Sequence, residues 1–328
     1  VRNCWFMANA RIAGQDWAIN GDDVIMSVAP FTHLYGLWTI LLALYAGARI
    51  ALLPVFSPPA MAQALHGYRP TGIFAVPAHI GALMQAGLWQ DLPTDDVRFI
   101  CQAGSIVPRH IAAAIDAKLA NGTVLQLFGM SELQAGCYTV PADTEADRLE
   151  TSGMAPRGME TRIVDETGAA VPRGEEGHLQ IRGIAVFWGY LNNPAASGEA
   201  FTGDGWFRTG DMAHYNAHGR VTITGRSKEL VNRGGIKYHP AEVEDIVNQM
   251  DEILACAVVP YADAVLGERA CLFVELAEGR QVRLDEICQR LAEAGLAKFK
   301  WPERLEVVDA MPLTPTRKII RGRLVQRL

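Results

Sequence analysis

The chain has 328 residues, enough for a large buried core and for about two structural units. Hydrophobic residues make up 49% of the sequence and charged residues 20%, as is usual for a globular protein. The net charge of −6 argues against nucleic acid as a main partner, because binding to phosphates needs a basic surface. Five basic residues gather near the C-terminus, a pattern typical of a solvated helix face: Arg317, Lys318, Arg321, Arg323 and Arg327.

The six cysteines are scattered, without a CxxC motif or the spacing of a metal site. This pattern indicates buried, reduced thiols in a cytoplasmic protein. The most apolar run, residues 34–48, is shorter than the roughly 18 residues that a membrane-spanning helix needs, so we expect no membrane span. The sequence begins with Val1 instead of Met, inside a stretch that reads as a helix, and we expect a fragment or a processed product.

The first half of the chain alternates apolar, strand-like runs with helical segments. Strands are predicted at residues 23–29, 49–53, 72–76, 97–103 and 123–128, and helices at 36–45, 57–67, 78–86 and 108–119. This order predicts an α/β fold with a doubly wound parallel sheet over residues 1–150. Ligands bind beyond the carboxyl ends of the strands in such sheets, where three segments stand out: 30–36, 103–105 and 129–132.

The pattern changes after Gly153. Short strands with Gly, Pro and Asp turns predict an antiparallel β sub-barrel over residues 153–225. After Lys228 comes a small α+β unit, with helices predicted at 240–249 and 284–294 and strands at 253–259, 270–275 and 304–308. We therefore predict two domains, residues 1–226 and 227–328.

Three motifs lie close together across this boundary. They are Trp-Phe-Arg-Thr-Gly-Asp at 206–211, Gly-Arg-Ser-Lys-Glu at 225–229 and Asn-Arg-Gly-Gly at 232–235. Together they closely resemble the adenylate-forming superfamily, which includes acyl-CoA synthetases, adenylation domains and luciferases. The resemblance implies that a carboxylate reacts with ATP to give an acyl-AMP, which a thiol then attacks. It also implies a C-terminal domain that moves between these half-reactions.

The segment Gly129-Met130-Ser131-Glu132 follows a predicted buried strand. A turn there would present the Ser131 hydroxyl to phosphate and the Glu132 carboxylate to Mg²⁺, an ion that prefers oxygen ligands. The alternative is an ordinary helix N-terminus with an acidic residue in its first turn. With Phe128, the segment resembles the nucleotide-binding element of the family.

Other residues gain a nucleotide-binding role from the resemblance. Asp211 is similar to the aspartate that binds the ribose hydroxyls, although a turn aspartate at a strand end is the simpler interpretation of that residue alone. Arg226 is similar to the arginine that adds a contact to ribose or phosphate. The turn Ala103-Gly104-Ser105 is similar to the backbone element against which adenine lies.

The C-terminal domain carries three further candidates. Lys318 resembles the lysine that bridges the carboxylate and the α-phosphate, and Arg317 stands where the family usually has Gly. Lys228 matches the hinge position. Gly234 and Gly235 would let the pantetheine arm of coenzyme A pass close to the backbone, or would simply form a tight turn.

The acid pocket is expected near His33, in a segment that resembles the family's acid-binding element, where a His or an aromatic residue contacts the carboxylate. The stretch Phe31–Leu34 lacks the Asp of relatives that activate amino acids, and Leu34 replaces the Asn of relatives that activate hydroxybenzoates. The expected lining, Leu34, Tyr35 and Trp38, is apolar and suits an aliphatic, alicyclic or unsubstituted aryl acid.

The leading hypothesis is an acid–CoA ligase that uses ATP, Mg²⁺ and coenzyme A. One alternative acceptor is the phosphopantetheine thiol of a carrier protein. The Ser/Thr/Gly-rich loop ending in Lys that holds the β- and γ-phosphates in the family is absent, together with the N-terminal portion that contains it, so a non-catalytic nucleotide- or CoA-binding remnant is a second hypothesis. A luciferase-like oxidoreductase is a third, and a serine hydrolase is disfavoured because no GxSxG motif occurs.

Overall fold

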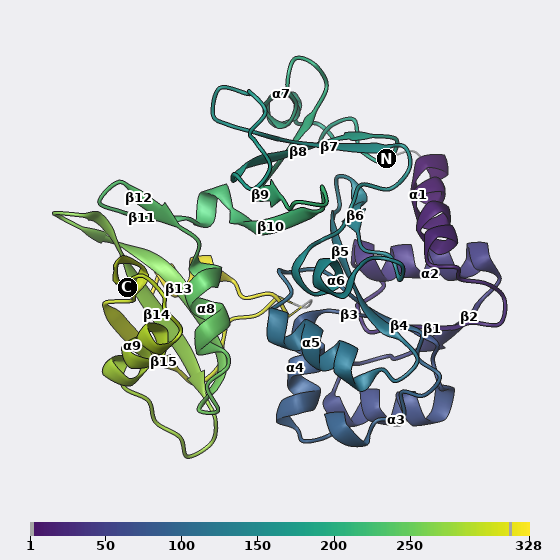
Figure 1. Ribbon diagram of the computed structural model, residues 1–328, viewed down its shortest axis with the longest axis horizontal. Helices are drawn as coiled ribbons and strands as arrows, with labels where there is room; N and C mark the ends of the chain where they lie inside the picture. Colours follow the sequence, from purple (N-terminus) through teal and green to yellow (C-terminus); the bar gives the residue numbers. More distant parts are fainter. Residues whose placement is uncertain (1–2, 315–316) are drawn as a thin grey trace. The chain divides into compact units, whose positions relative to one another are not determined.

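The computed structural model describes residues 3–314 and 317–328 (Figure 1). It divides into two compact units, Val1–Ile223 and Thr224–Leu328, which are described separately below. The strand β10 (Val221–Arg226) runs across this division.

The first unit contains a six-stranded sheet with the order β2-β1-β3-β4-β5-β6. All neighbouring strands run parallel except β5 and β6, which form an antiparallel pair. This confirms the predicted doubly wound α/β fold. The strands are β1 (Val24–Ser27), β2 (Arg49–Leu52), β3 (Gly72–Ala75), β4 (Phe99–Gln102), β5 (Thr123–Met130) and β6 (Gln134–Tyr138).

Helices cover both faces of this sheet, so every residue of its central strands β1, β3 and β4 is buried. In Figure 1, α1 and α2 lie on one face and α3, α4 and α5 on the other, and each face has its own apolar cluster. The helices are α1 (Asn3–Asp16), α2 (Leu34–Ala46), α3 (Pro58–Tyr68), α4 (Pro77–Gln85), η1 (Trp89–Asp91), α5 (Arg109–Lys118) and α6 (Glu145–Glu150).

A second sheet of the first unit has the order β10-β9-β8-β7, and its β7–β8 and β8–β9 pairs are antiparallel. It confirms the antiparallel architecture predicted for this part of the chain. Its apolar face packs with Leu133 and Cys137, so the β5–β6 hairpin joins the two sheets through one core. The elements are β7 (Met159–Val164), β8 (Gly177–Gly183), α7 (Pro194–Ala200) and β9 (Phe207–Tyr215).

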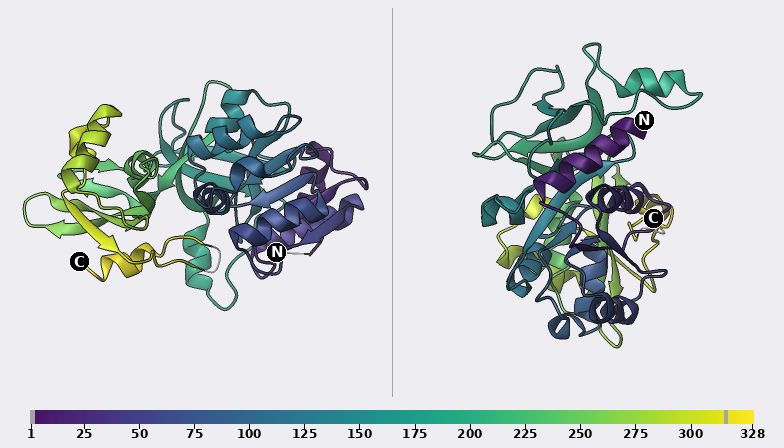
Figure 2. Two further views of the ribbon diagram at one scale, coloured as in Figure 1. Left: turned by 90° about the horizontal axis from the view of Figure 1, so that it is seen from below. Right: turned by 90° about the vertical axis from the view of Figure 1, so that its right-hand side faces the viewer.

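The second unit is an α+β unit, as predicted. Its strand order is β12-β11-β14-β13, and β15 pairs in parallel with β14. The helices α8 and α9 pack on one face, and α10 near the C-terminus packs on the other, where the yellow end of the chain runs in Figure 2. The elements are η2 (Ser227–Glu229), β11 (Val231–Arg233), β12 (Ile236–Tyr238), α8 (Pro240–Val247), β13 (Ile253–Asp263), β14 (Gly267–Leu276), α9 (Leu284–Glu293), η3 (Lys298–Lys300), β15 (Arg304–Val308) and α10 (Arg321–Val325).

Two expectations from composition bear on this architecture. No helix in the described ranges 3–314 and 317–328 is long and apolar enough to cross a membrane. Cys101, Cys137, Cys256 and Cys271 are free and buried, as predicted, and burial raises the pKa of the Cys101 and Cys137 thiols to about 12. These thiols therefore stay protonated at neutral pH.

Candidate functional site

His33 follows β1 at the carboxyl edge of the parallel sheet and begins helix α2. Its backbone is extended, and its ring Nδ1 accepts a hydrogen bond from the Tyr35 backbone N–H at 3.2 Å. A side chain that accepts from the second residue of a helix is an N-cap, so His33 has a structural role whatever else it contacts. Tyr35 is buried, and its hydroxyl donates to the Cys101 carbonyl at 2.9 Å.

The turn before α2 is held close to the helix by Gly36. A β-carbon at this position would lie only 2.4 Å from the Pro30 carbonyl oxygen, so the backbone approach requires glycine. Trp38, one turn further on, is 2% exposed and donates from Nε1 to Asn9 Oδ1 at 3.0 Å. In the structure its ring is therefore part of the core.

The segment Ala103-Gly104-Ser105 follows β4 at the same edge of the sheet. Ala103 is buried, while Ser105 is exposed. Gly104 has φ +90°, a conformation that side chains rarely adopt. The chain thus turns sharply at the end of the strand, and the adenine-binding role of this turn stays a prediction.

Ser131 and Glu132 lie in the turn of the β5–β6 hairpin, beside the segment after β4. The structure shows a hairpin, so the alternative of a helix N-terminus is wrong. The hairpin is tight because a β-carbon on Gly129 would lie 2.1 Å from the Gln134 carbonyl oxygen. Ser131 is exposed and Glu132 half-buried, so both are placed at the surface of this edge.

Glu132 has two contacts from one loop that lies far along the chain. Its carbonyl oxygen accepts from the Phe187 backbone N–H at 2.6 Å, and its Oε1 accepts from the Tyr190 hydroxyl at 3.1 Å. The sequence analysis did not single out Tyr190. The available signal was the unusual Trp-Gly-Tyr run at 188–190, but no local pattern indicates which carboxylate the tyrosine meets.

Asp211 lies in β9, in the second sheet of the first unit, with its side chain buried. Thr209 donates its hydroxyl to the Leu179 carbonyl and accepts from the Asp211 backbone N–H. Gly210 between them has φ +78°, and the β8–β9 register shifts beside it. A bulge of this kind changes the direction in which nearby side chains point, and Asp211 lies directly after it.

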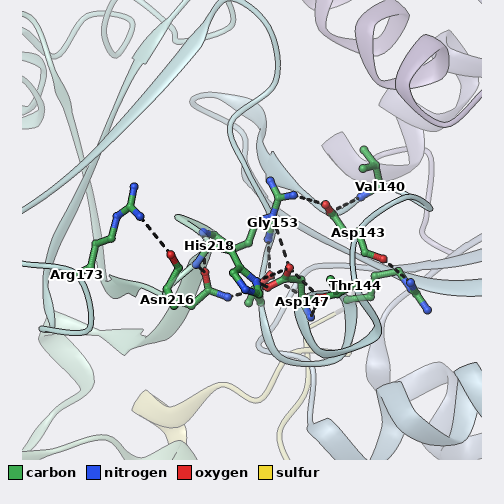
Figure 3. Close-up of polar contacts among 12 residues, drawn as sticks. Val140, Asp143, Thr144, Asp147, Gly153, Arg173, Asn216 and His218 are labelled. Atoms are coloured by element: carbon green, nitrogen blue, oxygen red, sulfur yellow. Dashed lines mark hydrogen bonds and ion pairs between the residues drawn. The ribbon is translucent and has the colours of Figure 1, made fainter.

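A polar network holds the turn that follows β9 (Figure 3). The buried Asp147 of α6 accepts from Asn216 Nδ2 at 2.7 Å, from Thr144 Oγ1 at 2.9 Å and contacts His218 Nδ1 at 3.0 Å. Arg220 forms an ion pair with Asp143, which lies just before α6. Burial opposes ionisation of Asp147, but the three hydrogen bonds outweigh it and lower the pKa of this carboxyl.

The remaining candidates lie in the second unit. Arg226 and Lys228 are exposed at the end of β10 and in η2. Gly234 and Gly235 form the turn of the β11–β12 hairpin, with φ +62° and +89°, so the tight turn is observed. A β-carbon on Gly235 would meet nothing within 4 Å.

Two hydrogen bonds join Lys318 to Thr314. Its backbone N–H donates to Thr314 Oγ1 at 3.0 Å, and its carbonyl accepts from the Thr314 N–H at 2.8 Å. Arg317 has φ +61°, so it adopts the left-handed conformation that Gly would allow freely, at a cost of about 1–2 kcal/mol. Arg317 therefore adopts this backbone conformation although it is not a glycine.

A partly buried ion pair follows Lys318 closely in the sequence. Arg321 donates to both carboxylate oxygens of Glu244, at 2.6 and 2.8 Å, and also lies 3.3 Å from Glu229, directly after the predicted hinge residue. Burial opposes the charge on Arg321 and lowers its pKa. The carboxylates of Glu244 and Glu229 outweigh this effect, so the pKa of Arg321 is raised overall. The Arg321 side chain thus links α10 to α8 and to η2, which contains the predicted hinge residue Lys228.

No group of three or more His, Cys, Asp or Glu side chains could hold a metal ion among residues 3–314 and 317–328. A single carboxylate such as Glu132 is nevertheless a suitable donor set for Mg²⁺, which commonly takes its other ligands from water and substrate phosphates. The described residues therefore fit a metal that arrives with a nucleotide.

Comparison with known proteins places this arrangement in a family. The model described as AMP-binding enzyme matches residues 1–191, and the model described as AMP-binding enzyme C-terminal domain matches residues 242–318. The chain belongs to the AMP-binding enzyme family. This confirms the resemblance to adenylate-forming enzymes drawn from the motifs.

Relatives within the family are acid–CoA ligases. The chain is 33% identical over 320 residues to a salicylyl-CoA synthase / salicylate adenylyltransferase from Streptomyces sp, covering 96% of this chain and 58% of the relative. It is 35% identical over 314 residues to a 2-hydroxy-7-methoxy-5-methyl-1-naphthoate–CoA ligase from Streptomyces carzinostaticus, covering 94% and 55%. The chain thus spans little more than half the length of these relatives.

Solved structures in the family share the fold. An ATP-bound MatB from Rhodopseudomonas palustris has a TM-score of 0.87 at 26% identity, covering 98% of this chain and 63% of that one. An anthranilate CoA ligase in complex with anthranoyl-AMP has a TM-score of 0.89 at 24% identity, with the same coverage. The second likeness supports the fold alone because the identity is low.

Proposed function

We propose that this chain carries out acid activation in an AMP-forming acid–CoA ligase: a carboxylate attacks ATP to give acyl-AMP and pyrophosphate, and coenzyme A then displaces AMP. The observation that carries the proposal is the grouping of Ala103–Ser105 and Phe128–Glu132 at the carboxyl ends of the adjacent strands β4 and β5. In open α/β sheets this edge is where ligands bind.

The nucleotide contacts follow from this grouping. Adenine lies against the exposed backbone of Ala103-Gly104-Ser105 and the ring of Phe128, with Gly129 and Met130 continuing the wall. Asp211 accepts hydrogen bonds from the ribose hydroxyls, and Arg226 adds a cationic contact. Each role uses the chemistry that the residue offers: flat backbone for a base, a carboxylate for a diol and a guanidinium for phosphate.

The phosphoryl transfer is assigned to three side chains. Ser131 donates its hydroxyl to a phosphate oxygen, and Lys318 neutralises the charge that develops between the carboxylate and the α-phosphate. Glu132 holds Mg²⁺, which supplies Lewis-acid stabilisation when bound. His33 contacts the carboxylate of the acid at the N-terminus of α2, in addition to capping that helix.

For the acid we propose an aryl carboxylate. The support is the identity of 33% and 35% with relatives named for salicylate and a hydroxynaphthoate, within the broader set of aliphatic, alicyclic and aryl acids that an apolar lining suits. Coenzyme A is the proposed acceptor, since these relatives are named as a salicylyl-CoA synthase and a naphthoate–CoA ligase. Gly234 and Gly235 leave the backbone of their hairpin open for the pantetheine arm, and Lys228 acts as the hinge.

The test is ATP–pyrophosphate exchange measured with the chain and a panel of benzoate, salicylate, naphthoate, cyclohexanecarboxylate and octanoate. We expect exchange that depends on the acid and is strongest with an aryl acid, followed by acyl-CoA and AMP in equal amounts when coenzyme A is added. Exchange that is independent of any acid, or release of ADP in place of AMP, would overturn the proposal.

A further inference from the structure

We propose that Tyr190 is a positioning residue for Glu132, and that its hydroxyl fixes the carboxylate in the orientation in which it takes up a divalent cation beside the nucleotide. This inference rests on the proposed function, because it assigns Glu132 to the metal. The Tyr190 hydroxyl donates to Glu132 Oε1 at 3.1 Å, and the two residues are 58 positions apart in the sequence.

The loop that carries Tyr190 holds the Glu132 backbone as well as its side chain. The Phe187 N–H donates to the Glu132 carbonyl at 2.6 Å, so one loop fixes both ends of the residue. A carboxylate in a surface turn otherwise samples several rotamers, and ordering such a side chain costs conformational entropy. The two contacts from this loop reduce that cost before the metal binds.

Aromatic contacts anchor the start of this loop. Phe187 is buried, and its ring lies 4.8 Å from Tyr190, 5.5 Å from Phe201 and 5.3 Å from Phe207, measured between centroids. The contacts with Tyr190 and Phe207 are edge-to-face, an arrangement that aromatic pairs favour. The core of the second sheet thus gives the ring of Tyr190 a packed contact, while the residue as a whole is 40% exposed.

The backbone of Tyr190 is fixed too. Its N–H donates to Ser197 Oγ at 2.8 Å, and Ser197 Oγ donates to the Asn193 carbonyl at 2.8 Å in the first turn of α7. Gly189 makes this approach possible, because a β-carbon there would lie 2.9 Å from Ser197 Oγ. These backbone contacts hold Tyr190 where its hydroxyl lies beside Glu132 Oε1.

The chemistry of the two side chains matches this role. A tyrosine hydroxyl is a neutral hydrogen-bond donor at pH 7, so it occupies Oε1 of Glu132 without adding charge. Partners that orient a metal-binding carboxylate typically contribute 10–100-fold in metal affinity, although they do not touch the metal.

The experiment compares Mn²⁺ binding by the wild-type chain, Tyr190→Phe, Glu132→Gln and Tyr215→Phe, each saturated with AMP, by the loss of the free Mn²⁺ signal in electron paramagnetic resonance. Tyr215→Phe is the matched control, since that hydroxyl donates to Thr161 Oγ1 at 2.9 Å in the second sheet. We expect Tyr190→Phe to raise the Mn²⁺ Kd about tenfold or more. Glu132→Gln should abolish binding and Tyr215→Phe should leave it unchanged.

The outcomes separate this inference from the proposed function. If Glu132→Gln abolishes Mn²⁺ binding while Tyr190→Phe binds like wild type, the positioning role is wrong and the metal assignment stands. If wild type and Glu132→Gln behave alike, the metal assignment falls and the inference with it.

Discussion

At the scale of single residues, the buried side-chain amide of Asn9 joins α1 to two neighbouring elements, α2 and β6. Its Nδ2 donates to the Ala135 carbonyl at 3.0 Å, while its Oδ1 accepts from the Ala135 N–H at 3.2 Å and from Trp38 Nε1 at 3.0 Å. Asn9 is 1% exposed. A side-chain amide can satisfy a peptide group in both directions, so Asn9 joins α1, α2 and β6 without leaving a polar atom unpaired.

Asn9→Leu should lower the free energy of unfolding of the first unit by about 3 kcal/mol or more, because it leaves the Ala135 peptide group and the Trp38 indole N–H without their partner in the core. Urea denaturation followed by tryptophan fluorescence measures this change. Asn121→Leu is the control, since that amide is exposed and makes one long contact of 3.4 Å. Equal effects of the two substitutions would show that Asn9 has no special role.

At the scale of elements, the turn between β9 and β10 depends on a charge in α6. The pKa of Asp147 is lowered in the folded chain, so its contribution to stability is present above its ordinary value near 3.8 and is lost as the pH falls through the lowered pKa. We expect the stability of the first unit to decrease steeply below about pH 4 and Asp147→Asn to reduce that slope. The measurement is urea denaturation between pH 2 and pH 7, with Asp22→Asn, an exposed carboxylate, as the control. A variant with the wild-type slope would contradict the assignment.

The elements also show what the sequence could predict. The five strands of the first half were identified because continuous apolar runs mark strands buried on both faces. The strand β6 was not identified because it carries Gln134 and Gly136, and the short hairpin β11–β12 because its polar residues show no clear alternation. Helices α6 and α7 are too short for a periodic pattern to appear.

The candidate site was less predictable than the fold. The positions of Gly104 and Ser131 followed from turns after recognisable strands, and the structure places both at one edge of the sheet. The contact of Tyr190 with Glu132 depends on the packing of Phe187 in a distant core, and no local sequence pattern encodes such a pair. The roles of the site residues, and the movement of the second domain about Lys228, stay predictions.

At the scale of the whole molecule, the two units divide the proposed reaction. The proposed nucleotide-binding edge lies in Val1–Ile223, and Lys318 lies in Thr224–Leu328. Lys318→Ala should therefore decrease acyl-AMP formation by about 100-fold or more, since it removes a cation that acts on the transition state, while the formation of acyl-CoA from supplied acyl-AMP is spared. Single-turnover assays of the two half-reactions measure this, with Lys298→Ala as a control for the loss of one surface lysine. Equal losses in both half-reactions would contradict the role.

The central claim is that the first unit holds an acyl-adenylate between the sheet edge and β9. Titration calorimetry with the non-hydrolysable sulfamoyl analogue of benzoyl-AMP tests it directly, because it needs neither turnover nor pyrophosphate. We predict saturable binding by the wild-type chain and by Asp22→Asn, and binding weaker by about tenfold or more in Asp211→Asn, which loses the charged acceptor for the ribose hydroxyls. Failure of the wild-type chain to bind the analogue, or equal binding by Asp211→Asn, would contradict the account.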